Sequence, residues 1–224
     1  MTERALRWMA LACLVPAAVL KADGPGPSRP PAIGPRTVSA GPKPSCDCDC
    51  DAGMPRRPTA KRYTRETARY RLPEVTLIGA DGNETRASAA IDHDGPVVLQ
   101  FVFTTCPTIC GPLSGSLASV RDVLGDELSG TRMVSISIDP EHDRPAQLRG
   151  YAEALKAGPD WRFYTGGRDE IAAIQKAFDA YQVNKMGHQP LTFLRPRRGA
   201  PWVRLTGLLG AADLAAEFRA MVKP

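Results

Sequence analysis

An apolar run that ends in two cysteines constrains this chain more than any other stretch. Residues 97–103 read Val-Val-Leu-Gln-Phe-Val-Phe, a β-branched and aromatic run that predicts a buried strand. Cys106 and Cys110 follow it, with three residues between them, in the turn that leads into a helix. Because open α/β sheets place their chemistry beyond the carboxyl ends of strands, we expect these two thiols to form the functional centre.

The position of the two cysteines predicts reactive thiols. Both Cys106 and Cys110 lie at or before a helix N-terminus, where free N–H groups and the helix dipole favour the thiolate. Such a pair can cycle between dithiol and disulfide, or it can bind a soft metal through both sulfurs. A spacer of two residues would have indicated a thioredoxin-type oxidoreductase, whereas three leave both outcomes open.

The N-terminal residues 1–22 have the composition of a targeting segment. Arg4 and Arg7 precede 13 mostly apolar residues, and Lys21 follows them. A spanning helix needs about 20 apolar residues, so this run fits the core of a secretory signal better. We therefore predict a signal peptide or a short membrane anchor. The protein is expected to be exported to the periplasm, tethered to the inner membrane if the segment is retained.

Residues 23–62 predict a disordered linker. Nine of the 21 prolines lie between residues 23 and 60, together with several glycines and serines and almost no large apolar residue. Such a composition buries too little apolar surface to offset the entropy of ordering the chain. Because proline stiffens a linker, this segment is expected to act as a semi-extended tether for the domain that follows.

Three cysteines in this linker alternate with aspartates. Cys46, Cys48 and Cys50 combine soft thiolates with carboxylates, which predicts an auxiliary site for Cu(I) or Zn. The spacing matches no known zinc finger, and the alternative is a disordered acidic segment whose thiols form disulfides.

The charge distribution argues against a nucleic-acid partner. Residues 1–71 hold 13 Lys and Arg against 6 Asp and Glu, a net charge of +7. Since the whole chain carries +5, the remaining residues carry about −2, so the predicted domain is nearly neutral.

Residues 63–224 predict one α/β domain with a thioredoxin-like fold and an extra N-terminal hairpin. Apolar periodicity and turn residues define its elements. Asp143, with Pro145 just after it, is expected to begin the second helix. The predicted strands are 75–78, 84–87, 97–103, 133–138, 161–164, 191–194 and 202–205, and the predicted helices are 112–124, 143–155, 169–181 and 211–222.

One of the three histidines is a candidate partner for the cysteines. His93 and His142 lie in charged loops and are interpreted as solvent-exposed residues. His188 lies just ahead of the strand 191–194, and in a thioredoxin-like fold that loop faces the cysteine turn.

Residues 70–222 resemble the Sco/SenC family of copper-handling, thioredoxin-like proteins that serve cytochrome c oxidase assembly. The motifs that carry the resemblance are Phe-Val-Phe-Thr-Thr-Cys-Pro-Thr-Ile-Cys at 101–110, Val-Ser-Ile-Ser-Ile-Asp-Pro-Glu-His-Asp-Arg-Pro at 134–145, Trp-Arg-Phe-Tyr-Thr-Gly at 161–166, and the histidine before strand 191–194. The resemblance implies that Cys106, Cys110 and His188 bind metal, and that Asp139 supports the site from behind the ligands.

Two functions follow from these observations. The leading hypothesis is a periplasmic metallochaperone that binds Cu(I) or Cu(II). It would deliver copper to the cytochrome c oxidase subunit that bears the binuclear copper centre, and other periplasmic copper chaperones or thioredoxin-like proteins are further expected partners. The alternative is a thiol–disulfide oxidoreductase in which Cys106 and Cys110 are the catalytic redox pair and act on periplasmic protein cysteines.

Overall fold

The computed structural model describes residues 62–223, and the predicted signal and linker segments, with Cys46, Cys48 and Cys50, lie outside these residues. The strands are β1 (Thr64–Ala68), β2 (Thr76–Gly79), β3 (Glu84–Arg86), β4 (Val97–Val102), β5 (Arg132–Ser137), β6 (Trp161–Gly166), β7 (Leu191–Arg195) and β8 (Trp202–Thr206). The helices are α1 (Ala87–Ile91), α2 (Cys110–Leu124), α3 (Pro145–Ala154), α4 (Arg168–Ala177) and α5 (Ala211–Val222), with 3-10 turns η1 (Gly125–Leu128) and η2 (Lys185–Gly187).

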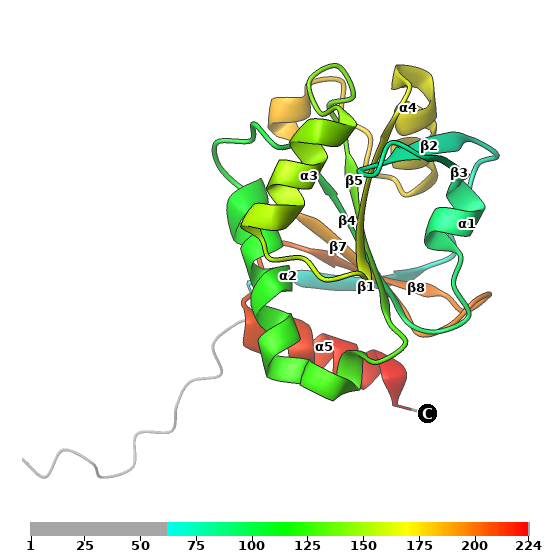
Figure 1. The fold of residues 1–224 in the computed structure, drawn as a ribbon. Helices are drawn as coiled ribbons and strands as arrows, with labels where there is room; N and C mark the ends of the chain where they lie inside the picture. The colour runs from blue at the N-terminus through cyan, green and yellow to red at the C-terminus, as the bar shows by residue number, and fades with distance from the viewer. Residues whose placement is uncertain (1–61, 224) are drawn as a thin grey trace, which may run out of the picture. The chain divides into compact units, whose positions relative to one another are not determined.

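The eight strands of the described domain form one mixed sheet in the order β1-β8-β7-β4-β5-β6-β2-β3 (Figure 1). Strand β4 lies inside the sheet, parallel to β5 and antiparallel to β7, and β5 is parallel to β6. The predicted hairpin is present as the antiparallel pair β2–β3, which joins the sheet at β6. Since a strand buried on both faces needs no polar face, the sequence of β4 is almost continuously apolar.

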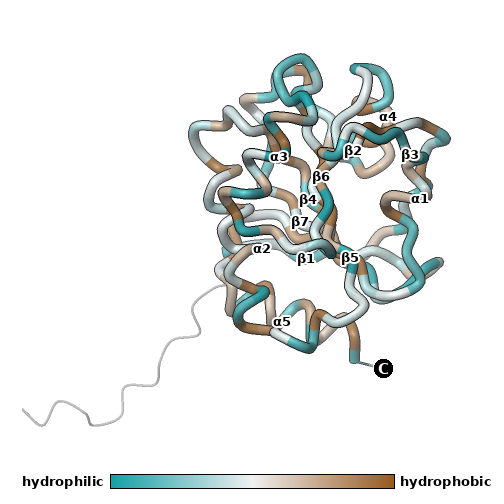
Figure 2. The backbone as a smooth tube through the Cα atoms, in the orientation of Figure 1, coloured by the Kyte–Doolittle hydropathy of each residue, from teal (hydrophilic) through white to brown (hydrophobic). Residues whose placement is uncertain are grey.

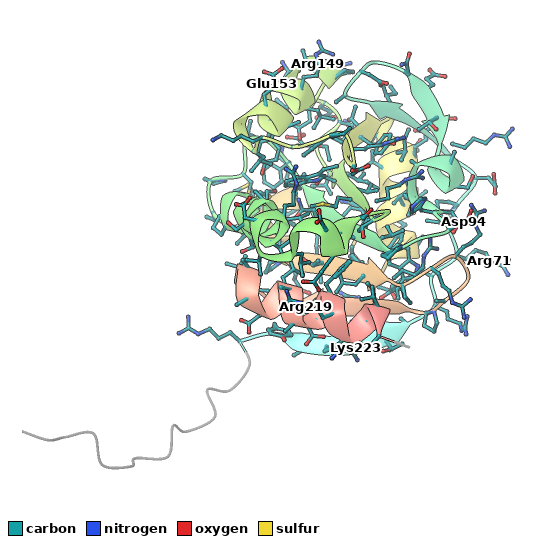
Figure 3. All side chains as sticks on the ribbon, turned by 60° about the horizontal axis from the view of Figure 1, so that its bottom comes forward. Arg71, Asp94, Arg149, Glu153, Arg219 and Lys223 are labelled. Carbon is teal, nitrogen blue, oxygen red and sulfur yellow. The ribbon has the colours of Figure 1, made fainter. Side chains whose placement is uncertain are left out.

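Helices cover both faces of the sheet. Helices α2, α3 and α5 pack on one face, with Val98 of β4 and Met133 of β5 in that core. Helices α1 and α4 pack on the opposite face, with Leu99 and Phe101 of β4. Figure 2 shows hydrophobic residues along the inner strands and mostly hydrophilic loops, and the charged side chains labelled in Figure 3 lie at the periphery. Alternate residues of β4 therefore serve two separate cores.

Helix α2 is held against the sheet by one apolar stripe. Leu113, Leu117, Val120 and Leu124 recur at helical spacing and are all buried. Each such side chain contributes about 1.5–3 kcal/mol when it leaves water. Gly125 ends the helix with φ of +49°, a left-handed conformation in which a residue without Cβ is unstrained. The N-terminus of α2, which carries Cys110, is thus fixed by packing along its whole length.

Two elements near the start of the domain differ from prediction. Strand β1 was not predicted, because its sequence Thr-Arg-Glu-Thr-Ala is polar and mostly exposed; antiparallel pairing with β8 holds it at the sheet edge. The second strand of the hairpin ends at Arg86 rather than at residue 87. Ala87 begins the short helix α1, whose Ala90 and Ile91 are buried.

Three helix ends also differ from prediction. Helix α2 begins at Cys110 and not at Pro112, so the second cysteine lies inside its first turn. Helix α4 ends at Ala177, and Tyr181, predicted on its apolar face, is 40% exposed beyond that end. Helix α3 begins at Pro145 and not at Asp143, and Arg144 occupies its N-cap position without a side-chain capping bond. Among the described residues, no helix has the length and hydropathy required to cross a membrane.

Candidate metal and redox site

The two cysteines lie where β4 leads into α2, as predicted, but in unequal surroundings. Cys110 is 1% exposed and packs with Val102, Phe103 and Leu113, whereas Cys106 is only partly buried at the rim of this cluster. The backbone N–H of Cys110 donates a hydrogen bond to Sγ of Cys106 at 3.4 Å. One sulfur therefore meets solvent and the other belongs to the core.

These surroundings shift the pKa values of the two thiols in opposite directions. Burial opposes ionisation of Cys106, but hydrogen bonds from the backbone of Thr108, the Cys110 thiol, and the backbones of Cys110 and Ile109 outweigh it and lower the pKa of Cys106 to about 7. Burial raises the pKa of Cys110 far above its ordinary value. At neutral pH, Cys106 is a nucleophilic thiolate for a substantial fraction of the time and Cys110 is a protonated thiol.

His188 meets the buried cysteine. Its Nε2 atom lies 3.6 Å from Sγ of Cys110, and its ring makes an edge contact with Phe103 at 5.4 Å between centroids. Its Nδ1 atom lies 3.1 Å from the carbonyl oxygen of Lys185. Since a carbonyl oxygen only accepts, Nδ1 carries the proton, and the lone pair of Nε2 faces the sulfur. Burial lowers the pKa of His188, which favours this neutral form.

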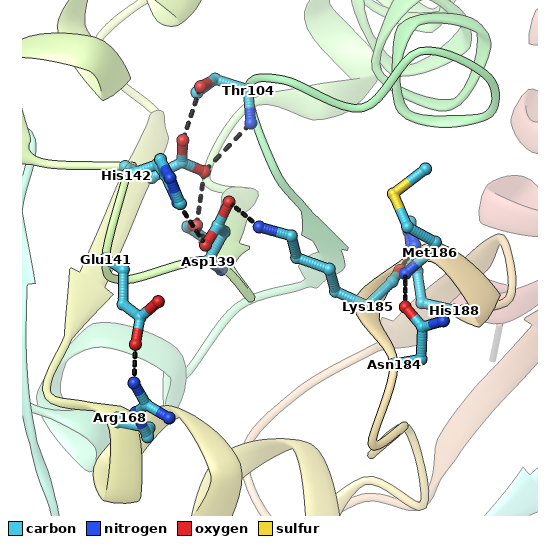
Figure 4. Close-up of polar contacts among 11 residues, drawn as sticks. Thr104, Asp139, Glu141, His142, Arg168, Asn184, Lys185, Met186 and His188 are labelled. Atoms are coloured by element: carbon cyan, nitrogen blue, oxygen red, sulfur yellow. Dashed lines mark hydrogen bonds and ion pairs between the residues drawn. The ribbon is translucent and has the colours of Figure 1, made fainter.

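Asp139 lies behind the histidine loop. Its carboxylate accepts hydrogen bonds from Nζ of Lys185 at 2.5 Å and from Nδ1 of His142 at 3.0 Å (Figure 4). Although burial opposes its ionisation, Lys185 and His142 together lower the pKa of Asp139 below its ordinary value. Asp139 therefore contacts the element that carries His188, consistent with the supporting position expected for it.

Asp143 is a site residue that the sequence interpretation missed. It is fully buried and accepts hydrogen bonds from the backbone N–H and hydroxyl of Thr104, at 3.0 and 2.5 Å, and from the hydroxyl of Ser137 at 2.5 Å. It thus ties the chain before Cys106 to the end of β5. The prediction that Asp143 begins the second helix is wrong: α3 begins at Pro145, and the carboxylate of Asp143 turns inward to these donors. The sequence signal that could have indicated this role is the presence of two hydroxyl donors, Thr104 and Ser137, at the ends of the neighbouring strands.

A second polar network lies under the first turn of α2. The hydroxyl of Tyr151 lies 3.3 Å from the carbonyl oxygen of Cys110 and 3.0 Å from Oγ of Ser114, and its single proton is donated to one of them at a time. The buried amide of Gln100 in β4 donates to Ser114 and to Ser135 in β5. Buried polar groups with partners on several elements fix the relative position of those elements. The backbone that carries Cys110 is held in this way from the sheet side.

Cys106, Cys110 and His188 are chemically suited to a soft metal, but their donor atoms do not yet surround a common position. Two thiol sulfurs and a neutral imidazole are ligand types that copper accepts in proteins. Within residues 62–223, no three His, Cys, Asp or Glu side chains are grouped closely enough to hold a metal as they stand. The predicted ligands Cys110 and His188 already adjoin each other, and Cys106 lies beside Cys110. Binding through all three would require the partly exposed Cys106 side chain to turn inward.

Comparison with known proteins places most of the chain in one family. Residues 70–223 match SCO1/SenC. A SCO1 protein homolog from Bacillus subtilis (strain 168) is 33% identical over 99 residues, which are 43% of this chain and 50% of that protein. The chain spans about half the length of the curated relatives it matches.

Solved structures share the fold. BsSco, a member of the Sco family of cytochrome c oxidase assembly proteins in which a disulfide switch was identified, is 25% identical with a TM-score of 0.58; the match covers 70% of this chain and 96% of that one. Bradyrhizobium japonicum ScoI with copper bound is 23% identical with a TM-score of 0.54, over 65% and 96% of the two chains. The predicted thioredoxin-like fold is confirmed.

Proposed function

This chain belongs to the SCO1/SenC family, and from that premise we propose that it is a copper-binding metallochaperone that delivers copper to, or matures, the binuclear copper centre of a respiratory cytochrome oxidase. The ligands would be Cys106, Cys110 and His188. The observation that carries the proposal is the contact of 3.6 Å between Nε2 of His188 and Sγ of Cys110, with Nδ1 engaged by the Lys185 carbonyl. A histidine whose second nitrogen is held in this way presents its lone pair in one direction, which is the arrangement of metal-ligating imidazoles.

The chemistry of the three donors supports copper as the cargo. Thiolates select Cu(I), and imidazole nitrogen also accepts Cu(II), so this set suits a carrier that meets both oxidation states. The copper-bound structure of the ScoI protein, which shares the fold, agrees with this assignment. Binding releases the proton of the Cys110 thiol, so copper is expected to bind more tightly as pH rises.

The setting of the proposed function is the periplasm. The basic start and short apolar run of residues 1–22 favour export, with retention at the inner membrane if they are not removed. The partner would be the oxidase subunit that bears the binuclear centre, and Cys46, Cys48 and Cys50 would hold copper before transfer.

The test is copper binding by the reduced full-length chain in which Cys46, Cys48 and Cys50 are replaced by serine, so that the linker thiols bind no copper, with and without His188→Ala. The variant should lose the sulfur-to-Cu(II) charge-transfer band or bind Cu(II) at least about tenfold more weakly, since an inner ligand is removed. His93→Ala is the matched control, because His93 is a half-buried loop histidine whose Nε2 lies 2.9 Å from the carbonyl oxygen of Gly130. An unchanged Cu(II) band in His188→Ala would contradict the ligand assignment.

A second function has an observation in its favour, the unequal acidity of the two thiols. We propose as the alternative that the Cys106 thiolate attacks a disulfide of a periplasmic protein, forming a mixed disulfide and releasing one substrate sulfur as a thiolate. Cys110 then attacks Cys106, its proton passes to Nε2 of His188, and the second substrate sulfur leaves. The substrate gains two electrons, and Cys106 and Cys110 end as a disulfide.

Alkylation rates distinguish the reactivity of Cys106 from that of Cys110. Iodoacetamide should modify Cys106 of the reduced chain with a midpoint near pH 7, because the reactive thiolate forms above the pKa of about 7, while Cys110 stays largely unmodified. Peptide mapping by mass spectrometry reads both sites in one sample. Equal rates at the two cysteines would contradict the mechanism, and a lack of turnover on protein disulfides would leave the copper function as the sole proposal.

A further inference from the structure

The loop that carries His188 has little apolar packing of its own. Residues 182–184, 186 and 187 are exposed, with Val183 at 92% and Met186 at 55%, and only His188 is buried. The side chain of Asn184 accepts a hydrogen bond from the N–H of Met186, which shapes the turn locally without tying it to the sheet. Some other contact must therefore hold the imidazole against the cysteine.

Lys185 connects this loop to the sheet, because its backbone carbonyl binds His188 and its side-chain ammonium group binds Asp139. Its carbonyl oxygen accepts hydrogen bonds from the backbone N–H of His188, at 3.2 Å, and from Nδ1 of the same residue, at 3.1 Å. Its ammonium group forms an ion pair with Asp139 at 2.5 Å and lies 5.7 Å from the centre of the Phe103 ring. That ring also contacts His188. The backbone and side chain of one residue thus connect the imidazole to the sheet.

The far end of this connection is firmly attached. Asp139 is 4% exposed, its backbone N–H donates to Oγ of Ser137 at the end of β5, and its carbonyl oxygen accepts from the N–H groups of His142 and Asp143. Asp139 therefore cannot follow the loop outward without breaking several bonds. An ammonium group held by such a carboxylate fixes the lysine backbone, and with it the carbonyl that orients the imidazole.

We propose that Lys185 is the positioning residue of this site: with Asp139 as its anchor, it sets the tautomer of His188 and holds Nε2 toward Cys110. The role in copper binding rests on the function proposed above, whereas the role in placing the imidazole concerns the metal-free protein and stands independently. Within residues 62–223, Lys185 forms no hydrogen bond or ion pair with either cysteine, so it acts through His188.

The experiment uses the reduced, metal-free full-length chain and the variant Lys185→Met, which keeps the stem and removes the charge. Nitrogen NMR of the His188 ring reports the tautomer, and hydrogen exchange reports the His188 N–H. We expect a mixture of tautomers and exchange about five- to tenfold faster, as for loss of a partly screened charged hydrogen bond. Lys185→Arg should keep the wild-type tautomer of His188 and an exchange rate within about twofold of wild type, because the arginine guanidinium also binds a carboxylate.

Controls separate positioning from general destabilisation. Lys176→Met removes an exposed lysine of α4 that lies over the Tyr181 ring, and it should change neither readout. Asp139→Asn should change the His188 tautomer and exchange rate as Lys185→Met does. The double variant should show no larger change than either single variant, because both substitutions break the same Lys185–Asp139 ion pair. Wild-type tautomer and exchange in Lys185→Met, or equal changes in Lys176→Met, would overturn the proposal.

Copper titration of the same variants, each with Cys46, Cys48 and Cys50 replaced by serine, then tests the link to function. Cu(II) binding should weaken about tenfold in Lys185→Met and recover in Lys185→Arg, the usual scale for loss of a group that orients a ligand. If the wild type binds no copper, the function proposed above fails, and the metal-free measurements still decide whether Lys185 orients His188. If Lys185→Met alters the His188 tautomer but binds copper with normal affinity, the role of Lys185 in copper binding is overturned and its role in orienting His188 stands.

Discussion

The two segments that meet at Phe103, the cysteine turn and the histidine loop, are held by opposite means. The cysteine turn is fixed by burial: Cys110 lies in the core, and Asp143, which is fully buried, binds the chain just before Cys106. The histidine loop is mostly exposed and is attached through the Lys185–Asp139 ion pair. The Cys110 sulfur is thus part of the folding core and Cys106 lies at its rim, whereas the imidazole is held by a single exposed loop, the kind of segment that can open without unfolding the domain.

This difference would suit the copper carrier proposed above, which must both hold and release its cargo. A group in the core keeps its place, whereas a group on a lightly held loop is able to move without unfolding of the domain. If the comparison is correct, substitutions on the cysteine side should cost global stability, and substitutions on the histidine side should mainly alter the site.

The largest effect is expected from Asp143→Ala. Removing this buried carboxylate leaves the Thr104 N–H and two hydroxyl groups without their acceptor, so we expect the free energy of unfolding to fall by about 3 kcal/mol or more. Urea denaturation followed by circular dichroism measures it. Asp122→Ala, an exposed aspartate of α2, is the control and should change stability by less than about 0.5 kcal/mol. Equal losses in the two variants would remove the basis of the comparison.

A moderate, pH-dependent effect is expected from Asp139→Asn. The folded-state pKa of Asp139 is lowered, so its contribution is present above the unfolded-state pKa of about 3.9 and is lost as pH falls through the lower folded-state value. We expect the variant to lose about 1 kcal/mol at pH 7, because Lys185 is partly solvated. Once the pH lies well below the folded-state pKa of Asp139, the two proteins should converge in stability. A difference that stays constant as the pH falls would show that the ion pair is not the cause.

The smallest effect is expected from Val183→Ala. This side chain is 92% exposed in the histidine loop, so its loss should change the free energy of unfolding by less than about 0.5 kcal/mol. Leu113→Ala is the matched substitution on the cysteine side, where a buried leucine of the first turns of α2 should cost about 2–5 kcal/mol. Thermal melts of both variants compare the two segments directly, and a substantial loss in Val183→Ala would show apolar packing that the exposure does not indicate.

Most of the fold was predictable because its strands and helices have strong local periodicity. The apolar run of β4, the stripe of α2 and the turn of the β2–β3 hairpin each gave a correct element. Strand β1 was not predictable from its own residues, since it is polar and exists through pairing with β8, which is more than 130 residues away along the chain.

The sequence by itself determined that two thiols follow a buried strand, and it identified the histidine that contacts the second of them. Those features depend on the local order of residues and on motifs that carry the family resemblance. Only the tertiary structure decided that Cys110 is buried while Cys106 is accessible, that Asp143 turns inward, and that Lys185 connects His188 to Asp139. The physical reason is that burial and hydrogen bonding are set by neighbours distant in the chain, and these set the thiol acidities and the direction of the imidazole lone pair.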